Sequence, residues 1–394
     1  MNTNFDPHFT AGGDFIKDST VTEFEPQQPT KVKFYVEVSG SMNGFFRANR
    51  ATSFKSDVWE IMSRYSPLAT DVCILTNDGN QGVSVGMDQF RTKMNKGEFV
   101  SASSTKVPIM LQAIIDSLDA DAGEVAILIS DMKYSPVGAA APNVLMTQYS
   151  TDVANILGKC GKAVSLVGAT SNYLDKKGNE VCTNSPYYYL VVGNAEQVAA
   201  MRNGISALLE GSGHFIDNID GGFDYGQPKY TFGISNRCMQ LGKEPTFTDY
   251  EECDEEDTCF VELKVNLEDY RWRIADENVF AQSFKAAAKY GSEIKVGEVK
   301  TEVENSGTKE LTRKATATVR LYVFNMATDS EVIEWTLELP EADYTLFGDY
   351  FDNSTGEDDP SKSYSLIDFV KGMTQGSAAN KKLEPNYILV SKKN

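Results

Sequence analysis

The spacing of apolar residues along the first part of the chain alternates between two patterns. Short apolar or β-branched runs predict strands, and between them apolar residues recur every three to four positions, as in amphipathic helices. The predicted strands cover residues 32–38, 71–78, 82–87, 124–130, 162–169 and 187–193, and the predicted helices cover 54–65, 107–118, 143–158 and 195–209. Residues 172–182, NYLDKKGNEVC, read as a hairpin-like insert before the last strand. Alternating strands and helices predict an α/β fold with a mostly parallel sheet flanked by helices.

The pattern changes after Gly221 to a period of two. Apolar residues alternate with polar ones at 261–267, 315–323 and 333–339, which is typical of sheets that bury one face. Helical spacing returns only near 279–289 and 364–373. We therefore predict an N-terminal arm at 1–30, an α/β domain at 31–221 and a β-rich, sandwich-like domain at 222–394.

Composition and charge narrow the classes of partner. The chain has 56 acidic and 37 basic residues and a net charge of −19, so its surface repels phosphate backbones and anionic lipids. We expect neither nucleic acid nor a membrane surface as partner. No run approaches the roughly 18 apolar residues of a membrane helix. The first residues lack the basic and apolar regions of a signal peptide, so a cytoplasmic location is the default expectation, and export remains the alternative if a leader has been removed.

Six cysteines are spread over the 394 residues, and none has zinc-ligand spacing. Cys73 lies in an apolar run, where a buried free thiol is expected. Cys253 and Cys259 flank the acidic run EECDEED. They would close a small disulfide in an exported protein and remain thiols in a cytoplasmic one.

Oxygen-bearing side chains follow two of the predicted strands. In VEVSGSMNG, Glu37, Ser39 and Ser41 occupy alternate positions where the first strand ends, and Asp131 follows the strand at 124–130. Thr105 stands immediately before the predicted helix at 107–118. In open α/β sheets, ligands bind beyond the carboxyl ends of the strands. Carboxylates and hydroxyls there are hard ligands, suited to Mg²⁺, Mn²⁺ or Ca²⁺.

This order of residues resembles the metal-ion-dependent adhesion site of von Willebrand factor A domains: Asp-x-Ser-x-Ser, a Thr before a helix, and an Asp after an apolar strand. The resemblance covers roughly residues 31–211 and departs from the family at Glu37, where Asp is usual. It implies an A-type fold, a divalent ion held by Glu37, Ser39, Ser41, Thr105 and Asp131, and a protein partner that presents a carboxylate to the ion. The loops at 43–49 and 133–142 are then expected to shape specificity. The resulting hypothesis is a non-enzymatic binding module.

Each of these residues also has a purely structural interpretation. Ser39 and Ser41 would form a Ser-Gly-Ser turn, Thr105 would cap a helix, and Asp131 would accept hydrogen bonds from loop amides. The alternative hypothesis is accordingly a structural component of a larger assembly, with a metal-free A fold.

An enzyme has little support in the sequence. The only histidines are His8 and His214, and neither a G-x-S-x-G elbow nor a P-loop occurs. The acidic run at 251–257 lacks EF-hand spacing, and DNSTGEDD at 352–359 is too loosely spaced for a predicted calcium loop. Tyr187, Tyr188 and Tyr189 fall in a strand and are expected to belong to the core and the sheet surface rather than to a ligand platform.

Overall fold

The computed structural model divides the chain into two compact units. The α/β unit comprises Phe24–Phe223 and Tyr344–Asn380, and the β-rich unit comprises Asp224–Asp343 and Lys381–Asn394. Residues 344–380 thus lie with the α/β unit, whereas the sequence pattern had assigned them to the C-terminal domain. The structure describes residues 25–69, 71–76, 81–99, 106–119, 122–134, 142–223, 226–233, 238–241, 244–248, 250, 259–274, 276–304, 314–340, 347, 350–352, 359–376 and 385–393.

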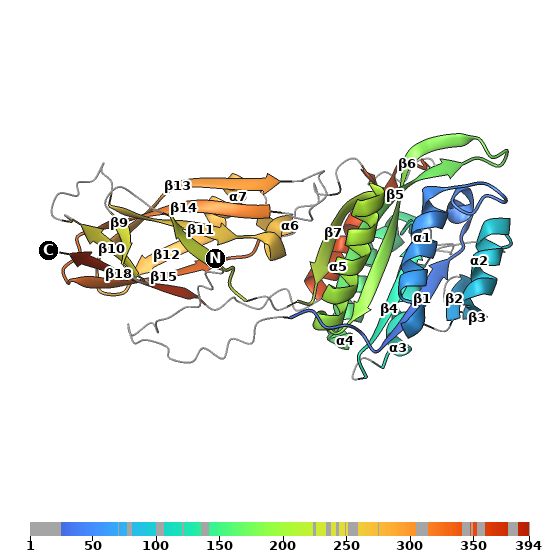
Figure 1. Cartoon of the computed structure of the whole chain (residues 1–394), viewed down its shortest axis with the longest axis horizontal. Coiled ribbons are helices and arrows are strands. Elements are labelled where there is room, and N and C mark those ends of the chain that lie inside the picture. Colours follow the sequence, from blue (N-terminus) through green and yellow to red (C-terminus); the bar gives the residue numbers. More distant parts are fainter. Residues whose placement is uncertain are drawn as a thin grey trace. The chain divides into compact units, whose positions relative to one another are not determined.

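The α/β unit contains a seven-stranded sheet with helices on both faces (Figure 1). Its strands are β1 (Lys31–Glu37), β2 (Asp71–Thr76), β3 (Gln81–Gly86), β4 (Glu124–Ser130), β5 (Ala163–Leu174), β6 (Glu180–Gly193) and β7 (Phe215–Gly221). Its helices are α1 (Ser53–Arg64), α2 (Met87–Lys96), α3 (Val107–Asp116), α4 (Pro142–Cys160), α5 (Ala195–Ser212) and α8 (Leu366–Gly376), with a short 3-10 turn, η1, at Gly40–Gly44. A small pair, β16 (Phe351–Asp352) and β17 (Ser363–Tyr364), lies apart from the main sheet. The α/β class is therefore confirmed.

The sheet has a parallel half and an antiparallel half. Its strand order is β3-β2-β1-β4-β6-β5-β7, and β1 runs parallel to both β2 and β4. The other neighbouring pairs are antiparallel, so the expected mostly parallel sheet is parallel only at β2-β1-β4. The reason lies in the insert at 172–182, which is the far end of one long β5–β6 hairpin. Strands joined by a tight turn can pair only in the antiparallel direction.

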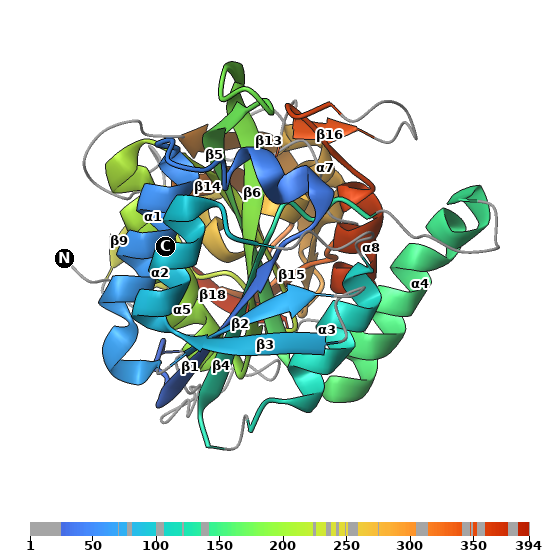
Figure 2. The same ribbon diagram turned by 90° about the vertical axis from the view of Figure 1, so that its right-hand side faces the viewer.

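Helices α1, α2 and α5 cover one face of the sheet, and α3, α4 and α8 cover the other (Figure 2). Alternate β1 residues Val32, Phe34 and Val36 belong to the hydrophobic core on the α1 side. Helix α8 packs on α4 at very short range, because a Cβ added at Gly372 or Gly376 would overlap the α4 backbone. The helix expected near 364–373 is thus present, and it closes a face of the α/β unit.

The β-rich unit contains two further sheets. Its strands are β8 (Tyr230–Gly233), β9 (Cys238–Leu241), β10 (Glu244–Thr248), β11 (Phe260–Asn266), β12 (Phe284–Ala288), β13 (Glu293–Glu304), β14 (Lys314–Phe324), β15 (Ser330–Leu337) and β18 (Asn386–Lys393), with short helices α6 (Arg271–Ile274) and α7 (Glu277–Ser283). One sheet has the order β12-β15-β18-β10-β9 and the other β13-β14-β11-β8. Buried side chains of both sheets join one hydrophobic cluster, in which Trp335 is fully buried.

One helix expected in this unit is shorter than its sequence pattern suggested. The prediction for 279–289 is wrong beyond Ser283, where α7 ends. From Phe284 onward, alternate residues face the core and the segment pairs with β15 as strand β12. The apolar spacing continued across the junction, but the structure changes there from a helical period to a period of two.

The structure also bears on the expected state of the cysteines and on the expected lack of a membrane helix. Cys73 is a free thiol, as are Cys160 and Cys182, and all three are partly buried. Cys259 is disulfide-bonded, whereas Cys253 lies outside the described residues. Within the described parts of the chain, no helix is both long and apolar enough to cross a membrane.

Candidate functional site

The sequence-predicted site residues lie where the strand order reverses. Strand β2 is on one side of β1 and β4 is on the other, and in open α/β sheets ligands bind beyond the carboxyl ends of the strands at such a reversal. Glu37 is the last residue of β1, and Ser39 and Ser41 follow it. Asp131 comes directly after β4. The structure therefore brings four of the five predicted residues to one edge, and the fifth, Thr105, lies outside the described residues.

The two carboxylates of the site are both buried. Glu37 is 2% exposed and Asp131 is 1% exposed. Glu37 Oε2 accepts a hydrogen bond from the hydroxyl of Ser130, and Asp131 Oδ1 accepts one from the backbone N–H of Lys133 at 3.2 Å. Met132, which lies between Asp131 and Lys133, adopts a left-handed backbone conformation with φ of 57°. This conformation is uncommon for a residue other than Gly. The chain turns sharply after β4 at Asp131 and Met132, and Glu37 at the end of β1 contacts Ser130, the last residue before that turn.

The two serine hydroxyls lie side by side. Ser39 Oγ and Ser41 Oγ are 2.9 Å apart and share a hydrogen bond. Ser39 precedes the η1 turn without capping it through its side chain. Ser39 is buried, while Ser41 is partly exposed and Gly40 is exposed. The hydroxyl pair thus lies close to the surface, just beyond the carboxyl end of β1.

The loop that carries Ser41 is held by contacts from several elements. Tyr173 on β5 donates its hydroxyl hydrogen to the carbonyl oxygen of Ser41 at 2.8 Å. Further along the loop, Lys55 Nζ on α1 donates to the carbonyl oxygens of Arg47 at 2.7 Å and Arg50 at 3.0 Å. Burial lowers the pKa of the Lys55 ammonium group, but the carbonyl oxygens supply the hydrogen bonds that the ammonium would otherwise make to water. The loop is therefore fixed before any ligand arrives.

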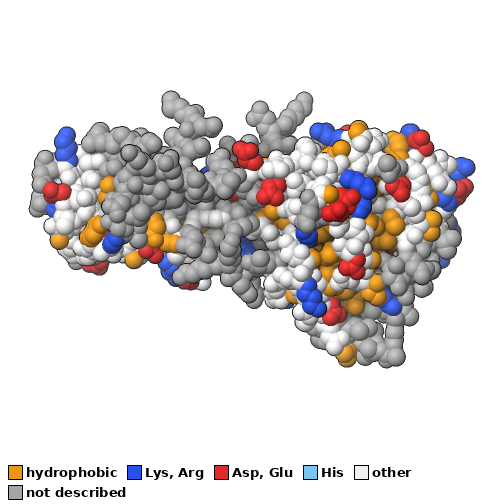
Figure 3. Space-filling view, turned by 90° about the horizontal axis from the view of Figure 1, so that it is seen from below, with side chains coloured by type: hydrophobic (Ala, Val, Ile, Leu, Met, Phe, Trp, Pro, Cys, Tyr) orange, Lys and Arg blue, Asp and Glu red, His pale blue; other side chains and the backbone are white. Residues whose placement is uncertain are grey.

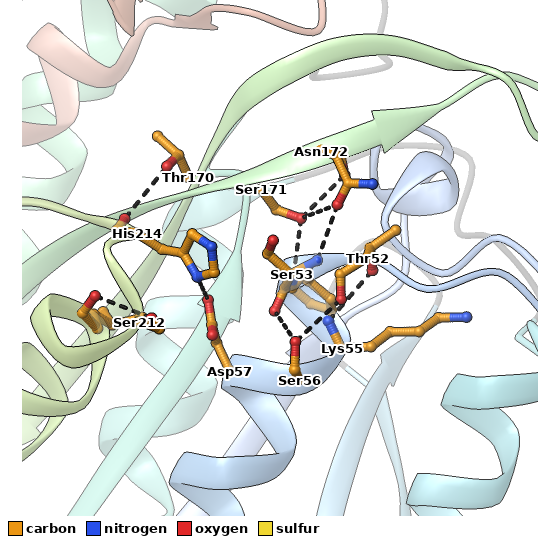
Figure 4. A network of polar contacts seen from close by, with 12 residues as sticks. Thr52, Ser53, Lys55, Ser56, Asp57, Thr170, Ser171, Asn172, Ser212 and His214 are labelled. Atoms are coloured by element: carbon orange, nitrogen blue, oxygen red, sulfur yellow. Dashed lines mark hydrogen bonds and ion pairs between the residues drawn. The ribbon is translucent and has the colours of Figure 1, made fainter.

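Strand β5 also fixes the first turn of α1, beside this loop (Figure 4). The side chain of Asn172 accepts a hydrogen bond from Ser53 N at 2.9 Å, and Ser171 Oγ accepts one from Phe54 N at 2.8 Å. Backbone N–H groups in the first turn of a helix have no partner within the helix. The antiparallel half of the sheet supplies those partners and so positions α1.

A second polar network lies one turn further along α1. His214 Nδ1 is 2.7 Å from Asp57 Oδ2 (Figure 4). Tyr187 donates its hydroxyl hydrogen to the same oxygen at 3.0 Å. Burial raises the pKa of the Asp57 carboxyl, while His214 and the hydrogen bond from Tyr187 partly offset that rise. The network joins α1, β6 and the end of α5. We interpret it as a tie between these elements rather than as a ligand site.

A distant segment of the chain completes the surroundings of Asp131. Ser363 Oγ donates to the carbonyl oxygen of Asp131 at 3.1 Å, and Lys133 Nζ donates to the carbonyl oxygen of Asp359 at 3.1 Å. Ser185 on β6 contacts the carbonyl oxygen of Pro360. The sequence pattern did not associate these residues with the site, because more than 200 positions separate Asp131 from Ser363 and no local pattern links them.

Buried tyrosines lie behind the strand ends. Burial is the main cause that raises the pKa of Tyr149 and of Tyr188. The charge of Glu37 contributes to the rise at Tyr149, and that of Asp131 contributes at Tyr188. All three tyrosines at 187–189 are fully buried, which confirms their assignment to the core. The strand ends thus combine buried negative charge with surface hydroxyls.

No cluster of three or more His, Cys, Asp or Glu side chains with the arrangement of metal ligands occurs among the residues the structure describes. The candidate set contains only two carboxylates and otherwise consists of hydroxyls. Of the expected specificity loops, 43–49 is described, whereas 135–141 lies outside the described residues. Comparison with family models, with curated proteins and with solved structures finds no match to this chain.

Proposed function

We propose that the α/β unit is a binding module of the von Willebrand factor A type, which holds a divalent ion at the carboxyl ends of β1 and β4 and engages a carboxylate on a protein partner. The observation that carries this proposal is the placement of Glu37, Ser39, Ser41 and Asp131 at the strand-order reversal. The antiparallel half of the sheet and Glu37 itself depart from the family pattern. The proposal therefore rests on the parallel half, β2-β1-β4.

The donor set suits a small, hard cation. In an octahedral Mg²⁺ site with bonds of about 2.1 Å, adjacent oxygens are separated by roughly 3.0 Å, close to the 2.9 Å between Ser39 Oγ and Ser41 Oγ. These hydroxyls would be ligands, together with Thr105 by the resemblance. Mn²⁺ and Ca²⁺ also accept oxygen donors and are the alternatives. When bound, the ion would offer a partner carboxylate an open coordination position.

The carboxylates would balance the charge of the ion. Two buried carboxylates near each other raise the free energy of the charged state, and a divalent cation offsets that repulsion. Glu37 is one methylene longer than Asp, and its Oε2 already accepts a hydrogen bond from Ser130. We therefore assign Glu37 an indirect role, in which it acts through its charge, and we assign Asp131 the position nearer the ion.

Metal titration of the whole chain tests the proposal. Thermal unfolding is measured in EDTA and in MgCl₂, MnCl₂ and CaCl₂, for the wild type, Ser41→Ala, Asp131→Asn and the control Ser66→Ala. Ser66 is an exposed serine with only a local hydrogen bond. An ion present at about 100 times its Kd stabilises the native state by about 2.7 kcal/mol. We expect this gain in the wild type and the control, and its loss in both site variants; no gain with any ion would refute the proposal.

A specific observation favours a second candidate, a metal-free structural unit. The hydroxyls of Ser39 and Ser41 bond to each other, and Asp131 accepts a hydrogen bond from Lys133 N, as the purely structural interpretation expects. On this candidate, the double variant Ser39→Ala with Asp131→Ala folds normally and co-purifies with the same assembly as the wild type, in EDTA and in Mg²⁺ alike. A loss of partner binding in the folded double variant would exclude it.

A further inference from the structure

Basic side chains from two distant segments gather at one corner of the carboxyl edge. Arg47 and Arg50 lie on the loop after η1, and Lys176 and Lys177 lie in the turn between β5 and β6. The guanidinium of Arg50 packs on that turn, since a Cβ built at Gly178 would be 2.8 Å from Arg50 Nε. We call these four cationic residues the basic rim. In Figures 1 and 2 the hairpin turn stands above the loop in both views.

The basic rim is exposed, and few acidic groups accompany it. Arg50, Lys176 and Lys177 are exposed, and Arg47, which donates to the carbonyl oxygen of Leu174 at 3.4 Å, is partly buried. Asp175 lies in the same turn, but its carboxylate accepts hydrogen bonds from the N–H groups of Lys177 and Asn179.

The other acidic side chain on the hairpin near the rim, Glu180, accepts a hydrogen bond from the hydroxyl of Thr183. The corner therefore carries an excess of positive charge in a chain whose net charge is −19. The face seen from below, away from the hairpin, shows small groups of acidic and basic side chains interspersed (Figure 3).

The basic rim adjoins the candidate ion site. The hairpin that carries Lys176 and Lys177 also carries Tyr173, whose hydroxyl donates to the carbonyl oxygen of Ser41. Lys55 fixes the backbone at both Arg47 and Arg50. A ligand that reached the hydroxyls of Ser39 and Ser41 would therefore pass beside cations held on a rigid support.

We propose that the basic rim recognises acidic residues that flank the ion-bound carboxylate, so that the partner presents an extended, acidic polypeptide segment. This inference rests on the proposed function and specifies its partner. Complementary charge at the edge of an interface speeds association and selects among partners. A nucleic acid fits less well, because a long phosphate backbone would extend beyond this small corner onto an acidic surface.

The test uses the full chain and a fluorescein-labelled peptide rich in aspartate, with binding followed by fluorescence anisotropy in Mg²⁺. The rim variant combines Arg50→Glu with Lys177→Glu. A matched control reverses the same number of exposed cations elsewhere, Arg64→Glu with Lys159→Glu, at the C-terminal ends of α1 and α4. We expect the rim variant to bind about tenfold more weakly and with a shallower salt dependence, and the control to change affinity less than about twofold. Circular dichroism and the Tm establish that both variants are folded.

Other outcomes separate this inference from the proposed function. Binding that requires Mg²⁺ but weakens equally in the rim variant and the control would refute the role of the basic rim. The proposed ion site would still be supported by that result. Binding that survives EDTA and still weakens in the rim variant would support the rim while the ion site fails. Absence of peptide binding by the wild type, or tighter binding of a single-stranded oligonucleotide than of the peptide, would overturn the polypeptide assignment.

Discussion

Both units of the protein bury carboxylates, but in different surroundings. In the β-rich unit, Glu331 on β15 is fully buried. It accepts hydrogen bonds from Tyr290 N at 2.7 Å and from the backbone N–H and hydroxyl of Ser292 at 3.1 and 2.6 Å. This one carboxylate holds the turn between β12 and β13. In the α/β unit, Glu37 and Asp131 are each buried, at the carboxyl ends of the neighbouring strands β1 and β4.

The difference separates a structural carboxylate from a candidate ligand-binding pair. A carboxylate surrounded by N–H and O–H donors stabilises the fold. Glu37 and Asp131 end neighbouring strands and accept hydrogen bonds from Ser130 and from Lys133 N; like charges brought close at such positions would raise the free energy of the charged state. Strain at Met132 adds to this contrast, since unusual backbone conformations concentrate at functional sites.

The largest expected effect is a difference in the free energy of unfolding between variants of Glu331 and of Asp131. Glu331→Ala leaves several donors of one turn without their acceptor, and we expect a loss of about 3 kcal/mol. Asp131→Asn, measured in EDTA, should cost less than about 1 kcal/mol, because the amide oxygen can still accept the hydrogen bond from Lys133 N while the buried negative charge is removed. Urea unfolding gives both values, with the exposed Glu334→Ala on the same strand as control. Equal losses for Glu331→Ala and Asp131→Asn would remove the distinction.

A second effect tests whether α8, which follows the segment beside Asp131, belongs to the α/β unit. Gly372→Ala places a methyl group against the carbonyl oxygen of Ser150 and the side chain of Val153 on α4. We expect a loss of about 1–3 kcal/mol from overpacking. The matched Gly211→Ala in α5 meets no atom within 4 Å and should gain about 0.5–1 kcal/mol from helix propensity. Thermal unfolding of the two variants compares them; a gain in both would mean that α8 does not pack on α4 in solution.

The smallest effect concerns pH. Burial alone would raise the pKa of the Glu331 carboxyl, but hydrogen bonds from Ser292, Tyr290 and Val332 outweigh it and lower the pKa below its ordinary value. The carboxylate therefore contributes stability above the ordinary glutamate pKa of about 4.3, and this contribution is lost as pH falls through the lowered folded-state pKa. The difference in unfolding free energy between wild type and Glu331→Gln should shrink as pH is lowered from neutral to about 3. A difference that stays constant would contradict this account.

Local patterns predicted much of the α/β unit, because α1, α3, α4 and α5 each bury a continuous apolar stripe. Helix α2 was missed since it buries only Phe90 and Met94. The antiparallel half of the sheet was not predicted for another reason: a strand buried on both faces has the same sequence pattern whether it runs parallel or antiparallel. The turn near Gly178 was the available signal, since a short turn can only join antiparallel strands.

The candidate site shows the same limits. Strand ends and residue chemistry were enough to predict that Glu37, Ser39, Ser41 and Asp131 share an edge. The contact between Ser363 and Asp131 required the fold itself. Lys55 was not predicted as a support for the site loop either, because a lysine in a helix ordinarily faces solvent, whereas here it is buried against loop carbonyl oxygens.

The interleaving of the two units has a consequence for how the protein is made. A ribosome releases β1 to β7 first, then nearly all of the β-rich unit, and only afterwards α8, which packs on α4. The last strand, β18, must then insert between β10 and β15 in the other unit. The α/β unit cannot complete its core when β7 emerges, and the β-rich unit cannot complete its sheet before β18 emerges, although domains generally fold as they emerge. The nascent α/β unit thus waits, with the α8-binding side of α4 uncovered, until more than 140 further residues have been translated.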